Sequence, residues 1–298
     1  MYNEELPRQP VRWQFFFFTE KYRIMQERKR IRPIRNLLLG ILCLLVNSCE
    51  LIDYHPYDVR IKGETGINGR NTARIEADLT GKKHFRFALI SDTQRWYDET
   101  EEMVQHINQQ DDVDFVIHGG DQADFGMTQE FLWMRDIMNE LNYPYTCIIG
   151  NHDCLGTGVE TFKEVYGPLN YAFTAGDVRF LCLQTNALEY DAPLSVPNFT
   201  FLDEELEHTS PEVKRTIVVM HTQPYDDQFN NNVAKIFQAY LKQFPNLMFC
   251  LHGHGHKFQV NDLFNDGILY YECPSAGKRS YLLFDINENG YDYEVVEF

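Results

Sequence analysis

The sequence predicts an α/β domain that extends from about residue 85 to the C-terminus at residue 298. Three observations support this prediction. Short continuous apolar runs alternate with segments of helical spacing, as expected of βαβ units with buried parallel strands. Several of these runs lead directly into clusters of polar residues, and the last runs are separated by Asn/Gly turns typical of hairpins. No internal repeat or low-complexity linker follows residue 80, so we expect a single domain.

Residues 1–48 are expected to lie outside this domain. Residues 26–36 are strongly basic, and residues 37–46 form an uninterrupted apolar run of ten, which is the layout of a signal peptide. A ten-residue helix, at about 1.5 Å per residue, is too short to span about 30 Å of hydrocarbon. Because a signal peptide rarely begins so far before its basic stretch, Met25 is an alternative start, and residues 1–24 are a dubious extension.

The small Ser48 directly before Cys49 resembles a bacterial lipobox, in which the cysteine is acylated and becomes the mature N-terminus. We therefore expect an exported lipoprotein, anchored in the membrane through Cys49 and facing the periplasm or the cell exterior. An uncleaved membrane anchor and cleavage at another position are the alternatives. Residues 49–84, polar and dotted with glycine, are expected to form a tether and possibly an edge hairpin.

The elements of the predicted domain follow in order along the chain. The first half contains three apolar strands and two intervening helices, at residues 85–90, 103–110, 114–118, 131–141 and 145–149. The second half continues with strands at residues 178–185, 216–220 and 247–251 and with helices near residues 202–208 and 233–244. Hairpin strands are predicted at residues 268–273, 281–286 and 293–298.

The charge distribution argues against one class of partner. Residues 1–48 hold nine of the 27 Lys/Arg residues and four of the 44 Asp/Glu residues, so the remainder has 18 basic and 40 acidic residues and a net charge of −22. Such an acidic body repels polyanions, so we expect no binding to nucleic-acid duplexes. A phosphate substrate would need local positive charge, which metal ions can supply.

Five predicted strands end in clusters of potential metal ligands. In chain order these clusters are residues 91–94 (SDTQ), 120–124 (GDQAD), 150–153 (GNHD), 221 (H) and 253–256 (GHGH). Because the carboxyl ends of strands in an α/β sheet meet at one edge, we expect the five clusters to converge. Carboxylates, imidazoles and an amide oxygen suit divalent ions, and the set is large enough to hold two of them.

This ordered series resembles the signature of the calcineurin-like metallophosphoesterases, which is D-x-H, G-D-x-x-D, G-N-H-D/E, a separate H and G-H-x-H. The resemblance covers about residues 85–257, and four of the five blocks match fully. It implies two mixed β-sheets packed as a sandwich with flanking helices. It also implies a dinuclear centre of Mn, Fe or Zn.

The resemblance assigns the ligands residue by residue. One ion would take Asp92, Asp121 and His256, and the second would take Asp121, Asn151, His221 and His254, with Asp121 bridging the pair. His152 would protonate the leaving oxygen or steady the transition state, and Asp124 would orient His152. The departure from the signature is Gln94, where the family usually has histidine. Its amide oxygen is either a weaker ligand of the first ion or a hydrogen-bonding group behind it.

These features predict a hydrolase that cleaves phosphate monoesters or diesters of a small metabolite or nucleotide with a metal-activated water. Arg95, Lys278 and Arg279 are candidate substrate contacts, with solvated surface cations as the alternative. Phe125 stands where the phosphoserine/threonine branch of the family typically has arginine, which disfavours that branch. A phosphoprotein phosphatase, and a non-catalytic surface lipoprotein with a structural metal site, are the alternative functions.

Overall fold

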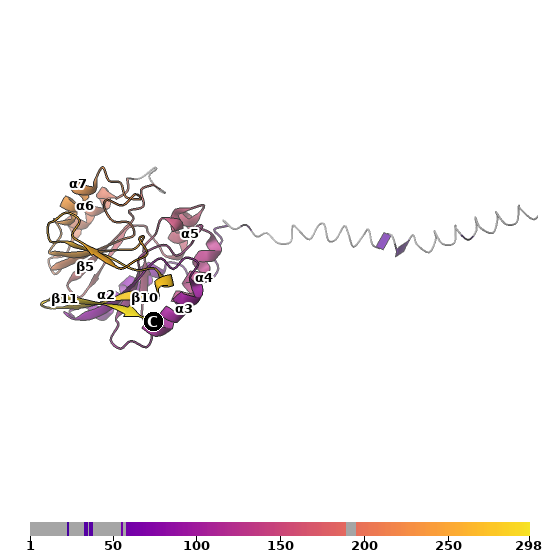
Figure 1. The fold of residues 1–298 in the computed structure, drawn as a ribbon, viewed down its shortest axis with the longest axis horizontal. Helices are drawn as coiled ribbons and strands as arrows, with labels where there is room; N and C mark the ends of the chain where they lie inside the picture. The colour runs from indigo at the N-terminus through magenta and orange to yellow at the C-terminus, as the bar shows by residue number, and fades with distance from the viewer. Residues whose placement is uncertain (1–22, 24–32, 35, 38–54, 56–57, 189–194) are drawn as a thin grey trace, which may run out of the picture. The chain divides into compact units, whose positions relative to one another are not determined.

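The computed structural model describes residues 58–188 and 195–298, together with residues 23, 33, 34, 36, 37 and 55 (Figure 1). The basic stretch and the apolar run of the predicted signal peptide lie almost entirely outside these residues, as does Cys49. Among the described residues, no helix combines the length and the apolar character that crossing a bilayer requires.

The first sheet has five strands in the order β11-β10-β1-β2-β3. Its members are β1 (Phe85–Ile90), β2 (Phe115–His118), β3 (Tyr145–Cys147), β10 (Ser280–Asn287) and β11 (Gly290–Glu297). The strands β1, β2 and β3 run parallel, whereas β10 pairs antiparallel with β1 and forms a hairpin with β11. The sheet is therefore mixed, as the sequence predicts.

The second sheet has six strands in the order β4-β5-β6-β7-β9-β8. Its members are β4 (Tyr171–Ala175), β5 (Val178–Leu183), β6 (Arg215–Met220), β7 (Leu247–His252), β8 (Gln259–Asn261) and β9 (Leu269–Glu272). The strands β5, β6, β7 and β9 run parallel, and β4 and β8 close the two edges antiparallel. Strand β9, predicted as part of a run of hairpins, thus joins β7 and β8 and not β10.

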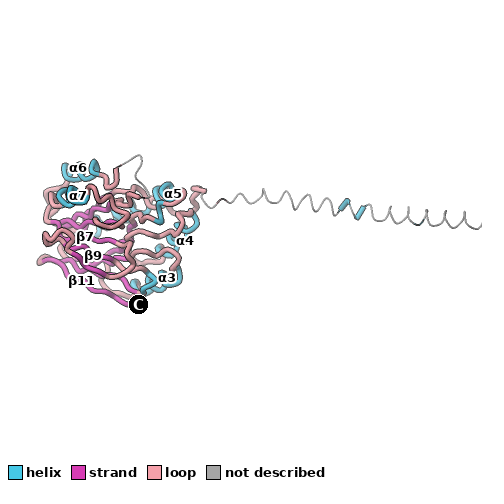
Figure 2. Tube along the Cα trace, turned by 45° about the horizontal axis from the view of Figure 1, so that its top comes forward, coloured by secondary structure: helices cyan, strands magenta, loops and turns pink. Residues whose placement is uncertain are grey.

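Helices cover the outer faces of both sheets (Figure 2). They are α3 (Tyr97–Ile107), α4 (Thr128–Met138), α5 (Gly158–Val165), α6 (Phe199–His208) and α7 (Ala234–Leu241), with the short 3₁₀ turns η2 (His152–Cys154) and η3 (Ala276–Lys278). Helix α2 (Ile67–Leu79) instead packs against the edge strands β3 and β4. Residues from α3, α4 and α5 pack on the first sheet in one apolar cluster, and residues from α6 and α7 pack on the second sheet in another.

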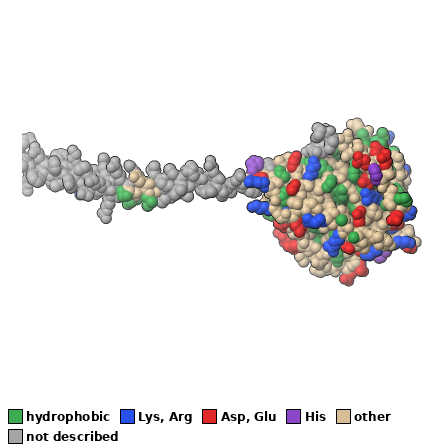
Figure 3. All heavy atoms as spheres, turned by 180° about the vertical axis from the view of Figure 1, so that it is seen from behind, with side chains coloured by type: hydrophobic (Ala, Val, Ile, Leu, Met, Phe, Trp, Pro, Cys, Tyr) green, Lys and Arg blue, Asp and Glu red, His purple; other side chains and the backbone are tan. Residues whose placement is uncertain are grey.

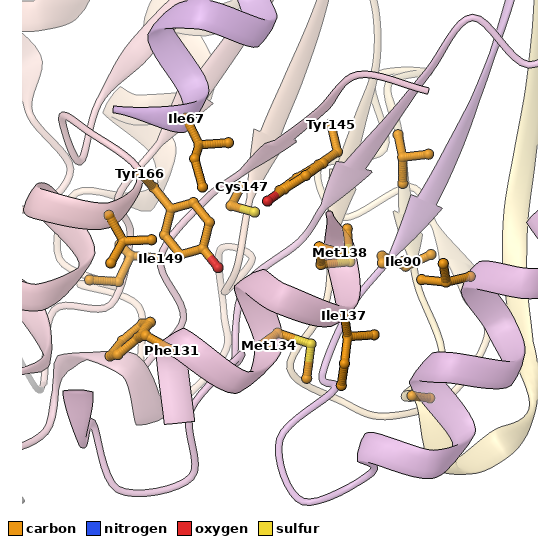
Figure 4. Close-up of a cluster of buried hydrophobic side chains, with 14 of the residues drawn as sticks. Ile67, Ile90, Phe131, Met134, Ile137, Met138, Tyr145, Cys147, Ile149 and Tyr166 are labelled. Carbon is orange, nitrogen blue, oxygen red and sulfur yellow. The ribbon is translucent and has the colours of Figure 1, made fainter. Parts of the chain in front are cut away.

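Alternation along β1 shows how the layers are joined. Ala88 and Ile90 belong to the cluster beneath the helices of the first sheet, which Figure 4 draws around Met134 of α4. Phe87 and Leu89 point the opposite way, into a cluster shared by both sheets. There Phe87 meets Phe180 of β5 edge-on, with ring centroids 5.4 Å apart. This period of two buries both faces of β1 and produces the predicted sandwich.

The edge hairpin expected between residues 49 and 84 is wrong over residues 67–79, which form helix α2. Only Ile67, Ile75 and Leu79 among its apolar residues are buried, so the apolar stripe is thin and easily overlooked in sequence. The helix is held partly by polar contacts. Asn68 Nδ2 donates to the backbone oxygen of Cys147, and the backbone N–H of Cys147 donates to Asn68 Oδ1, at 2.8 and 2.9 Å.

Candidate metal centre

The loops that follow β1, β2, β6 and β7 meet at one place, although they leave two different sheets. The backbone N–H of Asp92 donates to the oxygen of Gly120 at 3.0 Å, which joins the loops after β1 and β2. The N–H of Gly253 donates to the oxygen of His221 at 3.1 Å, which joins the loops after β6 and β7. The N–H of His254 donates to Asp92 Oδ2 at 3.1 Å and connects the two sheets.

Asp121 lies at the centre of the predicted ligands. Its Oδ2 atom is 3.3 Å from His221 Nε2 and 3.2 Å from Gln94 Nε2, while its Oδ1 accepts a hydrogen bond from the backbone N–H of His152 at 2.9 Å. The predicted ligands form two groups whose ligand atoms lie within 4.8 Å of one another: Asp121 with His221 and His254, and Asp92 with Asp121 and His256. Asp121 belongs to both groups, which is the placement expected of a bridging ligand.

The side chains of the second predicted site lie close to one another. Asn151 Oδ1 is 3.1 Å from His221 Nε2 and 2.9 Å from His254 Nδ1. The other ring nitrogen of His221 lies 2.8 Å from the backbone oxygen of Gly119. When that nitrogen carries the proton, the lone pair of Nε2 faces the site, as a metal ligand requires.

The first predicted site is less fully bonded. Asp92 Oδ1 is 3.2 Å from His256 Nε2, an ion-pair distance, and the His256 side chain is 48% exposed. Gln94 donates through Nε2 to Asp121, whereas Gln94 Oε1 is buried and accepts no hydrogen bond from the described residues. Buried oxygens without a donor are costly, and a cation beside them would offset that cost. The donor set therefore fits a hard divalent ion.

Electrostatics also favour positive charge at this position. Burial lowers the pKa of His221, but the adjacent Asp121 carboxylate outweighs burial and raises the pKa to about 10. The carboxylates thus stabilise a cationic imidazolium in a fully buried position. A divalent ion among the same groups would be stabilised for the same reason.

Several predicted ligands have a left-handed backbone. Asp92, Asp121, His254 and His256 have φ angles of 52°, 59°, 73° and 59°. Non-glycine residues in this region each cost about 1–3 kcal/mol, and such residues cluster at functional sites. The strained loops turn these side chains, which follow different strands, toward one point. The cost in folding stability is typical of a functional site.

His152 contacts Asp124 through one of its ring nitrogens. Its Nδ1 is 2.9 Å from the backbone oxygen of Asp124, and the Asp124 carboxylate is farther away, at 3.6 Å. That carboxylate is instead bonded by the guanidinium of Arg95. Asp124 therefore contacts His152, as expected of an orienting residue, but mainly through its main chain. With Nδ1–H donating to this carbonyl, Nε2 remains for proton transfer.

Asp153 has a structural task that the sequence analysis does not assign. Its buried carboxylate accepts four backbone hydrogen bonds of 2.7–2.9 Å, from Asp121, Gln122, Ala123 and Gly150. Burial and the nearby Asp121 raise the pKa of Asp153 to about 7, and the backbone donors oppose this shift. The sequence analysis includes Asp153 in the G-N-H-D block but assigns it no role. The role depends on contacts with residues some 30 positions earlier in the sequence, which the local pattern does not reveal.

Gly150 allows these loops to approach closely. A Cβ atom at this position would lie 2.1 Å from Asp121 Oδ1 and 2.2 Å from the Asp121 backbone nitrogen. Since no larger residue fits there without displacing Asp121, the glycine is needed for the shared ligand to take its position.

Of the three cations proposed to contact substrate, Arg95 lies beside the site through its bond to Asp124. Arg279 bonds instead to Glu102 and stacks over Phe298, with 5.1 Å between the guanidinium carbon and the ring centroid. Lys278 has no described interaction that places it in the site. Arg95 is therefore the strongest of the three candidates.

Comparisons with known proteins identify the family of the chain. The sequence profile described as calcineurin-like phosphoesterase matches residues 85–258, which is more than half of the chain. No curated protein sequence matches the chain.

Solved structures share the fold at low sequence identity. A dimetal phosphatase from Danio rerio is 14% identical with a TM-score of 0.58, covering 72% of this chain and 97% of its own. GAP50, the anchor in the inner membrane complex of Plasmodium, is 15% identical with a TM-score of 0.54 and coverages of 72% and 85%. A purple acid phosphatase from yellow lupin is 12% identical with a TM-score of 0.54 and coverages of 72% and 52%.

Proposed function

Because the chain belongs to the calcineurin-like phosphoesterase family, we propose that it hydrolyses phosphate esters of small molecules at a dinuclear metal centre. The observation that supports this most directly is the sharing of Asp121 between two groups of metal-ligand atoms. We assign Asp92, Gln94, Asp121 and His256 to the first ion. Asp121, Asn151, His221 and His254 would hold the second.

Two divalent ions held in this way would supply a nucleophilic water near neutral pH and neutralise charge on the phosphoryl oxygens. Side chains of the protein would supply the proton for the leaving group. The backbone oxygen of Asp124 accepts the proton on His152 Nδ1, so that in the imidazolium form the second proton lies on Nε2; its transfer to the leaving oxygen would return His152 to the neutral Nδ1–H tautomer. The partly exposed His152 side chain can reach a bound ester.

Asp153 and Arg95 would support this arrangement. Asp153 holds the backbone of the loops that carry Asp121 and Asn151, which would fix the position of His152 relative to the nucleophilic water. Arg95 is 60% exposed and bonded to Asp124, so its remaining donors can bind a phosphoryl oxygen of the substrate. On the face that Figure 3 presents, Lys and Arg lie among Asp and Glu, and no continuous basic surface suited to a polyanion is seen there.

A substrate panel tests the proposal. The intact chain would be freed of metal, reconstituted with Mn²⁺, Zn²⁺ or Fe²⁺, and assayed with p-nitrophenyl phosphate, its bis ester and a phosphopeptide. We expect turnover of at least one nitrophenyl ester and little of the phosphopeptide. Preferential turnover of the phosphopeptide would favour the phosphoprotein phosphatase. Two bound ions without turnover of any ester would favour the non-catalytic binding protein.

We also propose that the domain acts outside the cytoplasm, anchored through a lipid on Cys49. The basic residues 26–36, the apolar residues 37–46 and the Ser48-Cys49 pair support this proposal. Metabolic labelling with palmitate should mark the native chain and not the Cys49→Ser variant. Equal labelling of the two chains would exclude this cysteine as the anchor.

A further inference from the structure

The loop between β6 and α7 places a carboxylate behind one of the proposed metal ligands. Asp226 Oδ1 is 3.2 Å from His254 Nε2. The other ring nitrogen, Nδ1, faces the metal centre, 2.9 Å from Asn151 Oδ1. The imidazole of His254 therefore lies between the centre and Asp226, and each of its nitrogens has a separate partner.

We propose that Asp226 is a positioning residue that fixes the tautomer and orientation of His254 as a ligand of the second ion. This inference rests on the proposed dinuclear centre. A ligating imidazole offers a lone pair from one nitrogen and carries its proton on the other. A carboxylate that accepts this proton holds the ring in place and makes the ligating nitrogen more basic.

The loop holds Asp226 without help from His254. The side chain of Asn231 spans the loop: its Nδ2 donates to the backbone oxygen of Asp226 at 2.6 Å, and its Oδ1 accepts from the backbone N–H of Tyr225 at 2.7 Å. The N–H of Gln228 donates to Asp226 Oδ1 at 3.2 Å. The carboxylate is also only 23% exposed. It is therefore a fixed partner for the ring, unlike a mobile surface charge.

The two histidines proposed for the second ion differ in a way that makes the inference testable. The ring nitrogen of His221 that points away from the proposed ion, Nδ1, faces the backbone oxygen of Gly119, which no side-chain substitution removes. The outward nitrogen of His254 faces a side chain. The neighbouring Asp227 offers a matched control, because its carboxylate is 3.7 Å from the same nitrogen and 85% exposed.

The same three side chains, Asp226, Asp227 and His254, also have ligand atoms close enough to hold a cation of their own. That arrangement would require His254 to bind ions through both nitrogens. It predicts a third bound ion, which distinguishes it from the positioning role.

The test is calorimetric titration of Mn²⁺ into the metal-free intact chain and its variants. We expect the native chain and Asp227→Ala to bind two ions with the same affinities. Asp226→Ala should still bind two, with the affinity for one of them about 10- to 100-fold lower, as is typical when such a partner is removed. Asp226→Asn, which keeps an acceptor oxygen, should lie between them, and the melting temperature of the metal-free proteins should be unchanged.

The outcomes separate the inference from the function on which it rests. A native chain that binds fewer than two ions overturns the proposed centre, and the inference with it. Two ions in the native chain with native affinities in Asp226→Ala overturn the inference alone. It is also overturned if the native chain binds three ions and the variant two. A lower metal-free melting temperature in Asp226→Ala, with both ions weakened alike, would assign Asp226 to folding.

Discussion

The two halves of the proposed centre are built differently. In the second half, His221 is fully buried, and both nitrogens of His221 and of His254 have polar partners. In the first half, His256 is half exposed, and Gln94 Oε1 is buried without a hydrogen-bond donor among the described residues. Side chains of the second half therefore contact one another more extensively, whereas the first half leaves a buried acceptor oxygen that an ion would satisfy.

This contrast has a chemical consequence. The first half offers two carboxylates, an amide oxygen and one imidazole, and the second offers one carboxylate, an amide oxygen and two imidazoles. Oxygen donors favour harder ions such as Mn²⁺ or Mg²⁺, and imidazole suits Zn²⁺ and Fe²⁺. We expect the first ion to be the more weakly held and the more selective for Mn²⁺.

The largest effect is expected at the residue that the two halves share. Asp121→Asn should remove both ions, because its carboxylate belongs to both groups of ligand atoms. Turnover of p-nitrophenyl esters should fall by more than about 10⁴-fold, beyond the usual loss of a general acid. Metal analysis of the purified variant checks this. Retention of one tightly bound ion would mean that the halves do not depend on a common ligand.

Replacing the proton donor should affect chemistry and leave both halves intact. His152→Ala should lower turnover by about 10² to 10⁴-fold with metal content unchanged, because the His152 ring is assigned to proton transfer and not to ligation. Asp124→Ala should cost less, since the contact to His152 Nδ1 comes mainly from the Asp124 main chain. A loss of metal in His152→Ala would place this histidine among the ligands.

A substitution at Gln94 tests the difference in metal preference between the two halves. Gln94→His supplies an imidazole to the first half and should raise its preference for Zn²⁺ over Mn²⁺ by about tenfold, equivalent to about 1.4 kcal/mol. Competitive titration of the two metals measures the ratio. The affinities of the second half should not change. If the ratio stays constant, Gln94 acts behind the ligands and not as one of them.

The last expected effect is on folding stability and concerns His118, which lies behind the loops that carry both halves. Burial lowers the pKa of His118 to about 3; its Nδ1 accepts a hydrogen bond from the N–H of Gly120, and its Nε2 lies 2.9 Å from Thr93 Oγ1. Because the folded pKa lies below the usual 6.5, the neutral ring stabilises the fold above pH 6.5. That stability is lost as pH falls toward 3, at about 1.4 kcal/mol per pH unit.

Urea unfolding of the metal-free protein at pH 7 and pH 5 tests this. The native chain should lose about 2 kcal/mol more than His118→Asn over this interval. His208→Asn, on the exposed end of α6, is the control and should behave as the native chain. Equal losses in the native chain and His118→Asn would show that His118 is not held neutral.

The sequence predicts the elements that carry the ligands better than those that brace them. Strands such as β1 and β6 are continuous apolar runs, and their ligands follow directly, so local pattern and strand topology suffice. Helix α2 buries few apolar residues and is secured by Asn68, which local periodicity does not reveal. The contacts of Asp153 and Asp226 depend on loop conformations, including left-handed residues, that only the folded chain specifies.

The most direct test of the account is anomalous diffraction from crystals of the chain grown with Mn²⁺. We expect two peaks that share Asp121, one also bound by Asp92 and His256 and the other by Asn151, His221 and His254. Occupancy of the first peak should fall before that of the second as Mn²⁺ is withdrawn. A single peak, or ions bound away from Asp121, would contradict the dinuclear centre.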